Sequence, residues 1–382
     1  MTPSKEDPST DRRRGGEIVE RAPVYGWARR AVYGGGGVPG RLARGALTPV
    51  AWAWGAAAAR RLARGPAESS RRLPAPAISV GNVTVGGSGK TSLVEWIVRS
   101  GVPADTTVAV LSRGYGRAGT QPRALAPGAA DLPVAEIGDE PALLARAGAW
   151  IGIAADRFLA AREVIELGAR PGLFLLDDGL QHRVVPRALD LVVFAAADLE
   201  APARCLPAGP LRQRAEWRPP RAVWVVSGTD PRERAWPAGS IGRAYSAWWR
   251  ELPGTGADWV DAGTVPLAAW REGREAGFDP GGRPLVAFAG VARPDTVAAS
   301  ARRAGLELAG VVAFPDHHLH SEDDVAALRA AHPGAAFLTT EKDAVKCESA
   351  WFGDAPVGVL RRRMEPRDAA LLVREIAAAM GR

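Results

Sequence analysis

A glycine-rich loop between an apolar run and a helical pattern is the clearest chemical signal in this 382-residue chain. After the apolar residues 77–80, the loop reads Gly81-Asn82-Val83-Thr84-Val85-Gly86-Gly87-Ser88-Gly89-Lys90-Thr91. Glycines allow successive backbone N–H groups to point at anionic oxygens, a lysine reaches the terminal phosphates of a nucleotide, and a threonine hydroxyl binds Mg²⁺. We therefore expect residues 84–91 to hold a nucleoside triphosphate, although Thr84 stands where the general pattern has glycine.

A pair of acids at the end of an apolar run is the second signal. Residues 173–176 are followed by Asp177, Asp178 and Gly179. In phosphate-loop proteins a carboxylate at the end of a neighbouring strand holds Mg²⁺ directly or through water. We expect Asp177 to lie on the metal side of such a site, although Asp-Asp-Gly after a strand is also a common turn.

Two further acids precede a helical pattern. Gly138-Asp139-Glu140-Pro141 comes directly before the helical run 142–147. An acid before proline suits a helix cap, and the spacing alone favours that role. The alternative is that Asp139 takes a proton from an attacking hydroxyl.

Three of the five histidines occur within four positions, in the segment Phe314-Pro315-Asp316-His317-His318-Leu319-His320. Histidines at i and i+3 can converge on a metal, but we identify no second ligand group with suitable spacing. A histidine that shares a proton with a carboxylate is the other interpretation. Composition leaves both interpretations open.

A loop with two arginines follows the second expected strand and reads Ser112-Arg113-Gly114-Tyr115-Gly116-Arg117. Open α/β sheets bind their ligands at this end of the strands. Arg113, Tyr115 and Arg117 are therefore candidates for substrate contact, and a flexible, solvated loop is the alternative.

Apolar runs alternate with helical patterns, which predicts a mainly parallel sheet with helices on both faces. The expected strands are 107–111, 151–154, 173–176, 189–193 and 223–226, followed by 285–289 and 311–314 in a second block. Ser321 and Asp324 are spaced as a capping box for a helix over 321–331. The predicted fold is α/β of the phosphate-loop NTPase type, with a second, smaller α/β lobe and an N-terminal amphipathic helix. The expected divisions are a disordered basic extension (1–40), a membrane-associating helical segment (41–74), a nucleotide-binding domain (75–227), a linker region (228–283) and a C-terminal α/β lobe (284–382).

Composition and charge indicate a globular protein with a basic N-terminal end. Hydrophobic residues make up 47% of the chain and charged residues 24%, which excludes the disordered class. The net charge is +7, and residues 1–80 alone carry fourteen Lys and Arg against six Asp and Glu. This surplus argues against a nucleic-acid-binding core and for an arm that meets an anionic surface. Cys205 and Cys347 lie far apart and without metal-ligand spacing, so we expect a reducing compartment, no disulfide framework and no zinc site.

Residues 42–64 combine apolar side chains with flanking arginines. The apolar members include Val50, Trp52 and Trp54. The stretch is short for a bilayer span and contains a proline, so we expect an interfacial helix, with a helix packed on the catalytic domain as the alternative. Residues 1–20 lack the apolar core of a cleavable signal peptide.

Taken together, these motifs closely resemble those of the tetraacyldisaccharide 4'-kinase family, a kinase family of lipid A biosynthesis. They occur in family order over residues 45–380, and the family's own loop also has threonine at the position of Thr84. The segments that carry the resemblance are Gly81-Asn82, Thr84–Thr91, Ser112–Arg117, Gly138–Pro141, Asp177–Arg183, Leu206–Arg212, Phe314–His318 and Thr339–Lys346.

The resemblance implies an ATP- and Mg²⁺-dependent phosphotransferase. It would transfer the γ-phosphate to the 4'-hydroxyl of a tetraacylated glucosamine disaccharide 1-phosphate, forming lipid IVA of the lipopolysaccharide pathway. It implies a peripheral membrane enzyme on the cytoplasmic face of the bacterial inner membrane. No nucleic acid and no obligate protein partner are expected.

The resemblance also implies roles for individual residues. Lys90 would contact the ATP phosphates, and Thr91 and Asp177 would serve Mg²⁺. Asp139 would be the general base and would pair with His317. The two remaining acids of these motifs would support the site, namely Glu140 and Asp178.

The chain departs from the family pattern at three places. Ser92 replaces a usual proline, Gln213 replaces a common acid, and Ala292-Arg293 replace a usual Gly-Asn. The alternatives are another phosphate-loop NTPase, such as a GTP-dependent switch or metal chaperone, and a membrane-bound scaffold that binds nucleotide without chemistry. A guanine reader separates its Lys and Asp by one residue, whereas Lys342 and Asp343 are adjacent.

Overall fold

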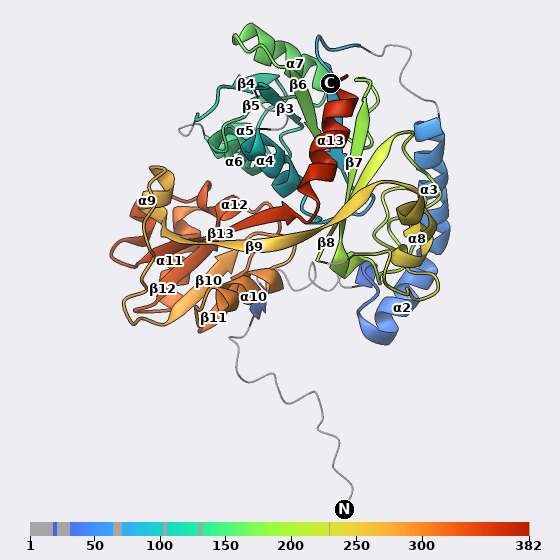
Figure 1. The fold of residues 1–382 in the computed structure, drawn as a ribbon. Coiled ribbons are helices and arrows are strands. Elements are labelled where there is room, and N and C mark those ends of the chain that lie inside the picture. Colours follow the sequence, from blue (N-terminus) through green and yellow to red (C-terminus); the bar gives the residue numbers. More distant parts are fainter. Residues whose placement is uncertain are drawn as a thin grey trace, which may run out of the picture. The chain divides into compact units, whose positions relative to one another are not determined.

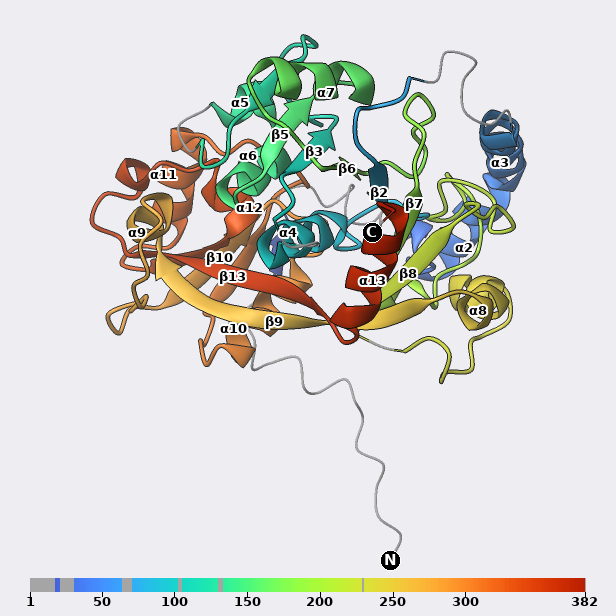
Figure 2. The same cartoon turned by 45° about the horizontal axis from the view of Figure 1, so that its top comes forward.

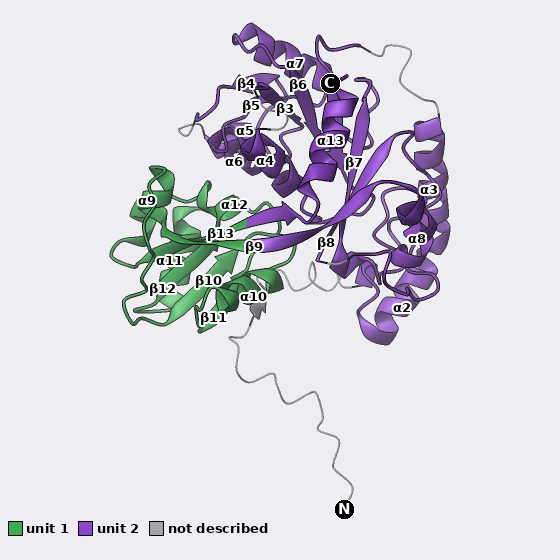
Figure 3. Cartoon of the chain, viewed as in Figure 1, with its two compact units in different colours: residues 1–23, 261–362 green, residues 24–260, 363–382 purple. Residues whose placement is uncertain are grey.

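The computed structural model describes residues 18–20, 31–63, 71–101, 105–129, 133–228 and 230–381 (Figure 1). The chain divides into two compact units (Figure 3). The smaller comprises residues 1–23 and 261–362, and the larger comprises residues 24–260 and 363–382. The chain passes between the units within two strands, β9 (Gly254–Pro266) and β13 (Val357–Pro366).

The larger unit contains a mostly parallel sheet in the order β8-β7-β2-β6-β3-β5-β4. Its strands are β2 (Ala77–Gly81), β3 (Val108–Ser112), β4 (Arg123–Leu125), β5 (Trp150–Ile153), β6 (Leu173–Asp177), β7 (Leu189–Ala195) and β8 (Ala222–Ser227). β4 pairs antiparallel with β5, and the other pairs are parallel. The register places Val80 of β2 beside Asp177 of β6, so the two strands end at the same edge.

The helices of this unit pack on strands that are buried along their whole length. The helices are α2 (Gly37–Ala46), α3 (Thr48–Ala63), α4 (Lys90–Ser100), α5 (Val134–Ile137), α6 (Asp139–Arg146), α7 (Arg157–Glu166), α8 (Ile241–Glu251) and α13 (Ala369–Ala379). Every residue of β6 and β7 is buried, as strands of a covered parallel sheet must be. In one core cluster, Tyr245 and Trp249 of α8 each meet Phe194 of β7 edge-on, and their own rings are tilted against each other. In another, Ala161 and Val164 of α7 pack with the even-numbered residues of β6.

The smaller unit contains the parallel strands β1-β11-β10-β12-β13, in that order. Its other strands are β1 (Ile18–Glu20), β10 (Leu285–Ala289), β11 (Gly310–Ala313) and β12 (Ala336–Thr340). Its helices are α9 (Leu267–Arg271), α10 (Asp295–Arg303), α11 (Glu322–Ala331) and α12 (Glu341–Ala344). The predicted capping box is confirmed, because Ser321 and Asp324 each accept a hydrogen bond from the other's backbone.

The predicted α/β class, with a mainly parallel sheet and a smaller second α/β lobe, is confirmed. The segment boundaries expected from the sequence differ from the units at three places. Residues 228–283, expected as a linker, contain α8, β9 and α9. Residues 363–382, expected in the C-terminal lobe, belong to the larger unit. Within the expected disordered extension, residues 18–20 form β1 and α2 begins at Gly37, while residues 1–17 and 21–30 lie outside the described residues.

Candidate active site

The phosphate loop connects β2 to α4, as the sequence predicts. Gly86 and Gly89 have φ of 93° and 91°, the left-handed region that favours glycine. A Cβ atom on residue 89 would lie 2.4 Å from Cε of Met364, so the Met364 side chain would have to move to accommodate it. Gly89 precedes α4 without any side-chain cap, and the buried Ser88 hydroxyl has no hydrogen-bond partner. A helix N-terminus with uncapped N–H groups is a ready site for a phosphate.

A second loop holds the phosphate loop in place. Val85 N–H donates to Pro210 O at 2.9 Å, and Arg212 N–H donates to Val83 O at 2.8 Å. Thr84 is buried and its hydroxyl donates to Asp198 Oδ2 at 3.2 Å. Because this hydroxyl has a partner of its own, the threonine that replaces the usual glycine braces the loop. Tyr33, ahead of α2, also donates its hydroxyl to the backbone of the loop, at Val85 O.

Asp177 and Asp178 occupy the edge of the sheet beside this loop. Lys90 Nζ lies 3.7 Å from Asp178 Oδ1, and Arg212 Nη1 lies 2.8 Å from both carboxylate oxygens of Asp178. Burial opposes ionisation of Asp178, but Lys90 and Arg212 outweigh it and hold its pKa below the ordinary value. Asp178 is therefore a fixed negative charge that positions the two cations.

Asp177 is in the opposite situation. It is 2% exposed, and its Oδ1 has no hydrogen-bond partner. Burial, followed by the nearby Glu140 carboxylate, raises the pKa of Asp177 to about 7, although Lys90 acts against the shift. A buried carboxylate oxygen without a partner beside a second carboxylate is the environment that a divalent cation stabilises. The residues present therefore fit Mg²⁺, with Asp177 as the ligand and Thr91 in the adjoining first turn of α4.

A buried arginine supports the same edge and was not predicted. Arg157, 4% exposed, is the first residue of α7 and donates to the backbone oxygens of Ala154 and Asp177 at 3.0 and 3.3 Å. Burial lowers the pKa of Arg157 to about 10, against the opposing effect of Asp177 and Asp178. It stays cationic at neutral pH. In the sequence it follows the end of a strand, at Asp156-Arg157, and that position is the signal that could have found it.

Asp139 and Glu140 are the first two residues of α6. The helix cap is Gly138, so Asp139 is inside the helix rather than its cap, and its Oδ1 accepts the Glu140 N–H at 2.9 Å. Asp139 is 4% exposed. Gly138 sets the position of Asp139. Its φ is 93°, and a Cβ atom on residue 138 would lie only 3.3 Å from Tyr115 O. The influence of Glu140 on Asp177 puts these acids and the metal-side acid in one region of the larger unit.

The loop after β3 carries the three expected substrate residues. Tyr115 is 69% exposed, and Arg113 is also exposed. Arg117 donates to Gln121 O at 2.7 Å. Gly114, with φ of 66°, packs its backbone against the side chain of Ile153. The loop is thus anchored at Gly114 and presents Arg113 and Tyr115 to solvent.

His317 belongs to the smaller unit, on the turn between β11 and α11. It has a φ of 62°, and its backbone N–H donates to Gly290 O at 3.2 Å. Lys342 Nζ lies 3.0 Å from Asp316 Oδ1 and 3.3 Å from His317 Nε2. This turn therefore combines an acid, an imidazole and an ammonium group.

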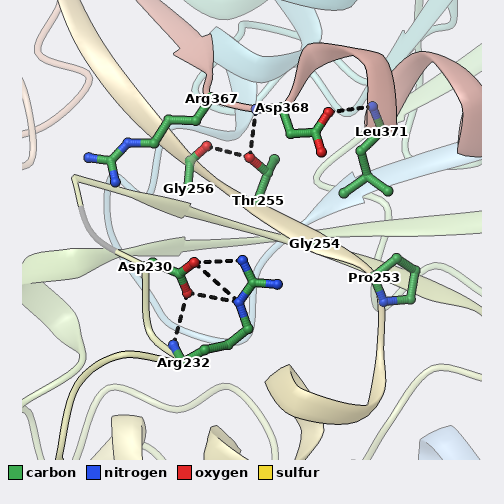
Figure 4. Close-up of a pocket in the computed structure, with 9 residues that line it drawn as sticks. All are labelled: Asp230, Arg232, Pro253, Gly254, Thr255, Gly256, Arg367, Asp368 and Leu371. Atoms are coloured by element: carbon green, nitrogen blue, oxygen red, sulfur yellow. Dashed lines mark hydrogen bonds and ion pairs between the residues drawn. The ribbon is translucent and has the colours of Figure 1, made fainter.

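One cavity of about 340 Å³ lies elsewhere in the larger unit (Figure 4). Two arginines at this cavity are each paired with an acid: Arg232 Nη2 lies 2.5 Å from Asp230 Oδ2, and Arg367 Nη2 lies 2.8 Å from Asp258 Oδ1. Its wall includes Thr255, which accepts the Asp368 N–H at 2.9 Å. No predicted site residue lines it, so we assign the chemistry to the phosphate loop instead.

The helices ahead of β2 expose apolar side chains. On α3 the exposed fractions of Trp52 and Trp54 are 69% and 51%, and Leu42 of α2 is 70% exposed. Trp54 Nε1 nevertheless donates to Arg212 O at 3.0 Å. Within the described part of the chain, no helix combines the length and apolar character needed to cross a bilayer.

Comparison with known proteins assigns the family. A family model described as Tetraacyldisaccharide-1-P 4'-kinase matches residues 43–380. The chain belongs to the tetraacyldisaccharide 4'-kinase family. The Tetraacyldisaccharide 4'-kinase of Methylobacterium sp. (strain 4-46) is 37% identical over 364 residues, which cover 94% of this chain and 98% of the relative. That of Anaeromyxobacter sp. (strain Fw109-5) is 36% identical, covering 90% and 91%.

A solved structure agrees with this assignment to the tetraacyldisaccharide 4'-kinases. LpxK from Aquifex aeolicus, crystallised in complex with ATP, matches with a TM-score of 0.68 and 25% identity. The match covers 88% of this chain and 99% of that chain. The family is one of ATP-dependent kinases of lipid A biosynthesis, so the resemblance seen in the sequence motifs is confirmed.

Proposed function

We propose that this kinase transfers the γ-phosphate of ATP to the 4'-hydroxyl of a tetraacyldisaccharide 1-phosphate, forming lipid IVA. The observation that carries the proposal is the pairing of an uncapped phosphate loop with the buried, partnerless oxygen of Asp177 at the same sheet edge. The family match supplies the acceptor. Phosphoryl transfer needs positioning and charge neutralisation more than covalent help, and these residues provide both.

The loop and its neighbours position the nucleotide. Backbone N–H groups of residues 84–91 donate to the phosphate oxygens, and Lys90 leaves its 3.7 Å contact with Asp178 to approach the terminal phosphates. Thr91 and Asp177 would hold Mg²⁺, which would supply positive charge to offset that of the phosphates. Asp178 keeps Arg212 oriented through their ion pair.

Asp139 accepts the proton of the attacking hydroxyl. Its burial at the start of α6 supports this role, since a side chain held in a fixed place can be positioned against the attacking hydroxyl. From the family motifs, we assign His317 the role of its histidine partner and Glu140 a supporting role. Arg113, Tyr115 and Arg117 face the acceptor sugar and its phosphate from the loop after β3.

The substrate carries four acyl chains, so the enzyme works at a lipid surface. Exposed Trp52, Val50 and Leu42 on α2 and α3, together with neighbouring arginines, fit insertion at an anionic interface. We place the enzyme as a peripheral protein on the cytoplasmic face of the inner membrane.

A direct transfer assay tests the proposal. The full chain is incubated with γ-labelled ATP, Mg²⁺ and the tetraacyldisaccharide 1-phosphate in mixed micelles, and the label in the lipid is measured. We expect label in the lipid with ATP and little with GTP, and loss of transfer in Lys90→Ala. Hydrolysis without lipid labelling, or equal turnover of GTP, would overturn it.

A further inference from the structure

Two histidines and an acid that the proposed reaction does not use lie together in the smaller unit. They are His318 and His320, on the segment after β11, and Asp324 in the first turn of α11. Each offers one ligand atom, and these atoms all lie within 4.8 Å of one another. Small movements of the side chains would bring the three atoms onto one ion.

His320 has the features of a prepared metal ligand. It is 6% exposed, and its ring meets Phe314 and Phe288 edge-on. Its Nε2 lies 3.1 Å from Asp343 Oδ1, while its Nδ1 is buried with no hydrogen-bond partner. A histidine that donates one ring N–H to a carboxylate and keeps the other nitrogen bare is the arrangement that metal-binding histidines adopt.

Asp343 is held as a permanent acceptor for that N–H. Its Oδ1 lies 2.8 Å from Lys346 Nζ and accepts the Gly290 N–H at 3.1 Å, and its Oδ2 accepts the Thr340 hydroxyl at 2.8 Å. These contacts hold the Asp343 carboxylate in place, and the carboxylate in turn orients the His320 ring through its contact with Nε2.

His318 and Asp324 complete the set. His318 Nε2 lies 2.9 Å from Asp324 Oδ2, and the His318 ring stacks on Phe314 with centroids 4.8 Å apart. Their side chains are 29% and 21% exposed, so the cluster is open to solvent on their side while His320 closes the other. A metal ion bound here would replace the direct contact between His318 and Asp324.

We propose that His318, His320 and Asp324 bind a divalent transition metal, with Zn²⁺ as the preferred ion and water in the remaining position. Two imidazoles and one carboxylate suit Zn²⁺, whereas Mg²⁺ takes oxygen ligands and would be excluded. The sequence reading identified no second ligand group beside the histidines. The structure supplies one because the capping box turns Asp324 back toward His318. The bound ion joins α11 to the turn that carries His317.

Metal titration of the full chain tests the site. The protein is stripped with a chelator, excess Mg²⁺ is added to occupy oxygen-ligand sites, and Zn²⁺ is titrated against a competing chromophoric chelator. We expect a single tight Zn²⁺ per chain. We also expect Co²⁺ at the same site to give visible absorption bands characteristic of histidine ligation.

Variants locate the ion. His320→Phe preserves an aromatic ring between Phe314 and Phe288, and Asp324→Asn preserves an acceptor for the helix cap, so both are designed to fold. Each should weaken Zn²⁺ binding at least about tenfold, the scale seen even for losses around metal ligands. His332→Asn, at the end of α11 outside the cluster, is the matched control and should bind as the parent does.

The outcomes divide cleanly. Absence of tight Zn²⁺ binding by the parent overturns the site, and so does unchanged binding in both His320→Phe and Asp324→Asn when circular dichroism shows them folded. Kinase activity is a separate measurement, so failure here leaves the transfer assay unaffected.

Discussion

Asp177 is the residue at which burial and chemistry meet. Its carboxylate is desolvated, faces Glu140, and keeps one oxygen without a partner. A residue selected for stability alone would not be left in this state, since a buried carboxylate without full hydrogen bonding destabilises the fold. The cost is offset when a cation binds.

The raised pKa of Asp177 predicts a pH-dependent stability. Its pKa is about 7 in the folded chain and near the ordinary 3.8 in the unfolded chain. Between these values the folded state binds more protons, so the free energy of unfolding falls as pH rises from about 4 to about 7. Without Mg²⁺ or nucleotide, Asp177→Asn should remove this loss and stabilise the chain above pH 7 by up to about 4 kcal/mol.

Thermal unfolding of parent and variant at several pH values measures this effect. Asp354→Asn, an exposed acid, is the control and should leave the pH profile unchanged. Parallel pH profiles for the parent and Asp177→Asn would show that Asp177 does not bind a proton in this range.

Asp139 carries the prediction on the reaction itself. Asp139→Ala should leave the affinity for ATP nearly intact, because Asp139 lies in α6 and the phosphate loop lies between β2 and α4. It should lower kcat by about 10²–10⁴. Initial rates of lipid phosphorylation and nucleotide binding by calorimetry separate the two effects. Unchanged turnover would remove Asp139 from the mechanism.

At this scale the sequence predicts residues whose role is carried by a local motif. Lys90 and Asp177 are recognisable because each follows a strand in a pattern with known chemistry. Arg157 escapes because its important partner, Asp177 O, is twenty positions away and is a backbone atom that no side-chain pattern reports. The bracing role of Thr84 escapes for the same reason, since Asp198 is 114 positions away.

The phosphate loop is the element in which shape matters most. Gly89→Ala combines a left-handed φ, which costs about 1–2 kcal/mol for a residue with Cβ, with the close approach of Met364. We expect at least about tenfold weaker ATP binding, measured by calorimetry, since 1.4 kcal/mol equals a factor of ten.

Gly101 at the other end of α4 provides the matched control. Its φ is 59°, but nothing lies within 4 Å of a Cβ there. Gly101→Ala should therefore lower stability through strain alone and leave ATP affinity unchanged. Equal loss of affinity in both variants would mean that the loop's shape is not what binds the nucleotide.

Helix α3 carries the prediction on membranes. Replacing exposed Val50 and Trp52 by serine should weaken binding to anionic vesicles, because the apolar area that enters the interface is lost. Vesicle sedimentation measures the bound fraction. Leu167→Ser, equally exposed at the end of α7, is the control and should bind normally. Full binding by the Val50/Trp52 variant would assign these side chains to another role.

Elements with regular patterns are predictable, and elements that depend on tertiary context are not. The strand expected at 285–289 has the same bounds as β10, because five consecutive apolar residues are buried on both faces of the sheet. β9 was missed because its thirteen residues include Gly254, Gly256 and Gly263 and change from buried to half-exposed along their length. Such a strand has neither a continuous apolar run nor a clean alternation.

At the scale of the molecule, the larger unit is built from two separate stretches of the chain, with the smaller unit between them in the sequence. The chain leaves the larger unit within β9 and returns within β13, and α13 then lies beside β7 and β8 in both views (Figure 1, Figure 2). From the sequence alone the last residues are assigned to the second lobe, because no local sequence pattern indicates that the chain goes back to the larger unit.

Because α13 belongs to the larger unit, substitutions in α13 should destabilise that unit. Ile376 is fully buried, so Ile376→Ala should destabilise the chain by about 2–5 kcal/mol, whereas Val373→Ala, at a 36% exposed position, should change little. Hydrogen exchange should accelerate in β2, β7 and β8 of the larger unit. Acceleration confined to β10 and β12 would assign α13 to the smaller unit.

The indole of Trp54 connects the exposed face of α3 to the loop that holds the phosphate loop in place. Trp54 Nε1 donates a hydrogen bond to the backbone oxygen of Arg212, and the guanidinium of Arg212 donates one to Asp178. In the proposed membrane-bound state, these two contacts would fix the distance between the lipid headgroups and the outermost phosphate of the nucleotide. A sugar hydroxyl whose own height is fixed by its acyl tails would then meet the phosphate without diffusing out to find it.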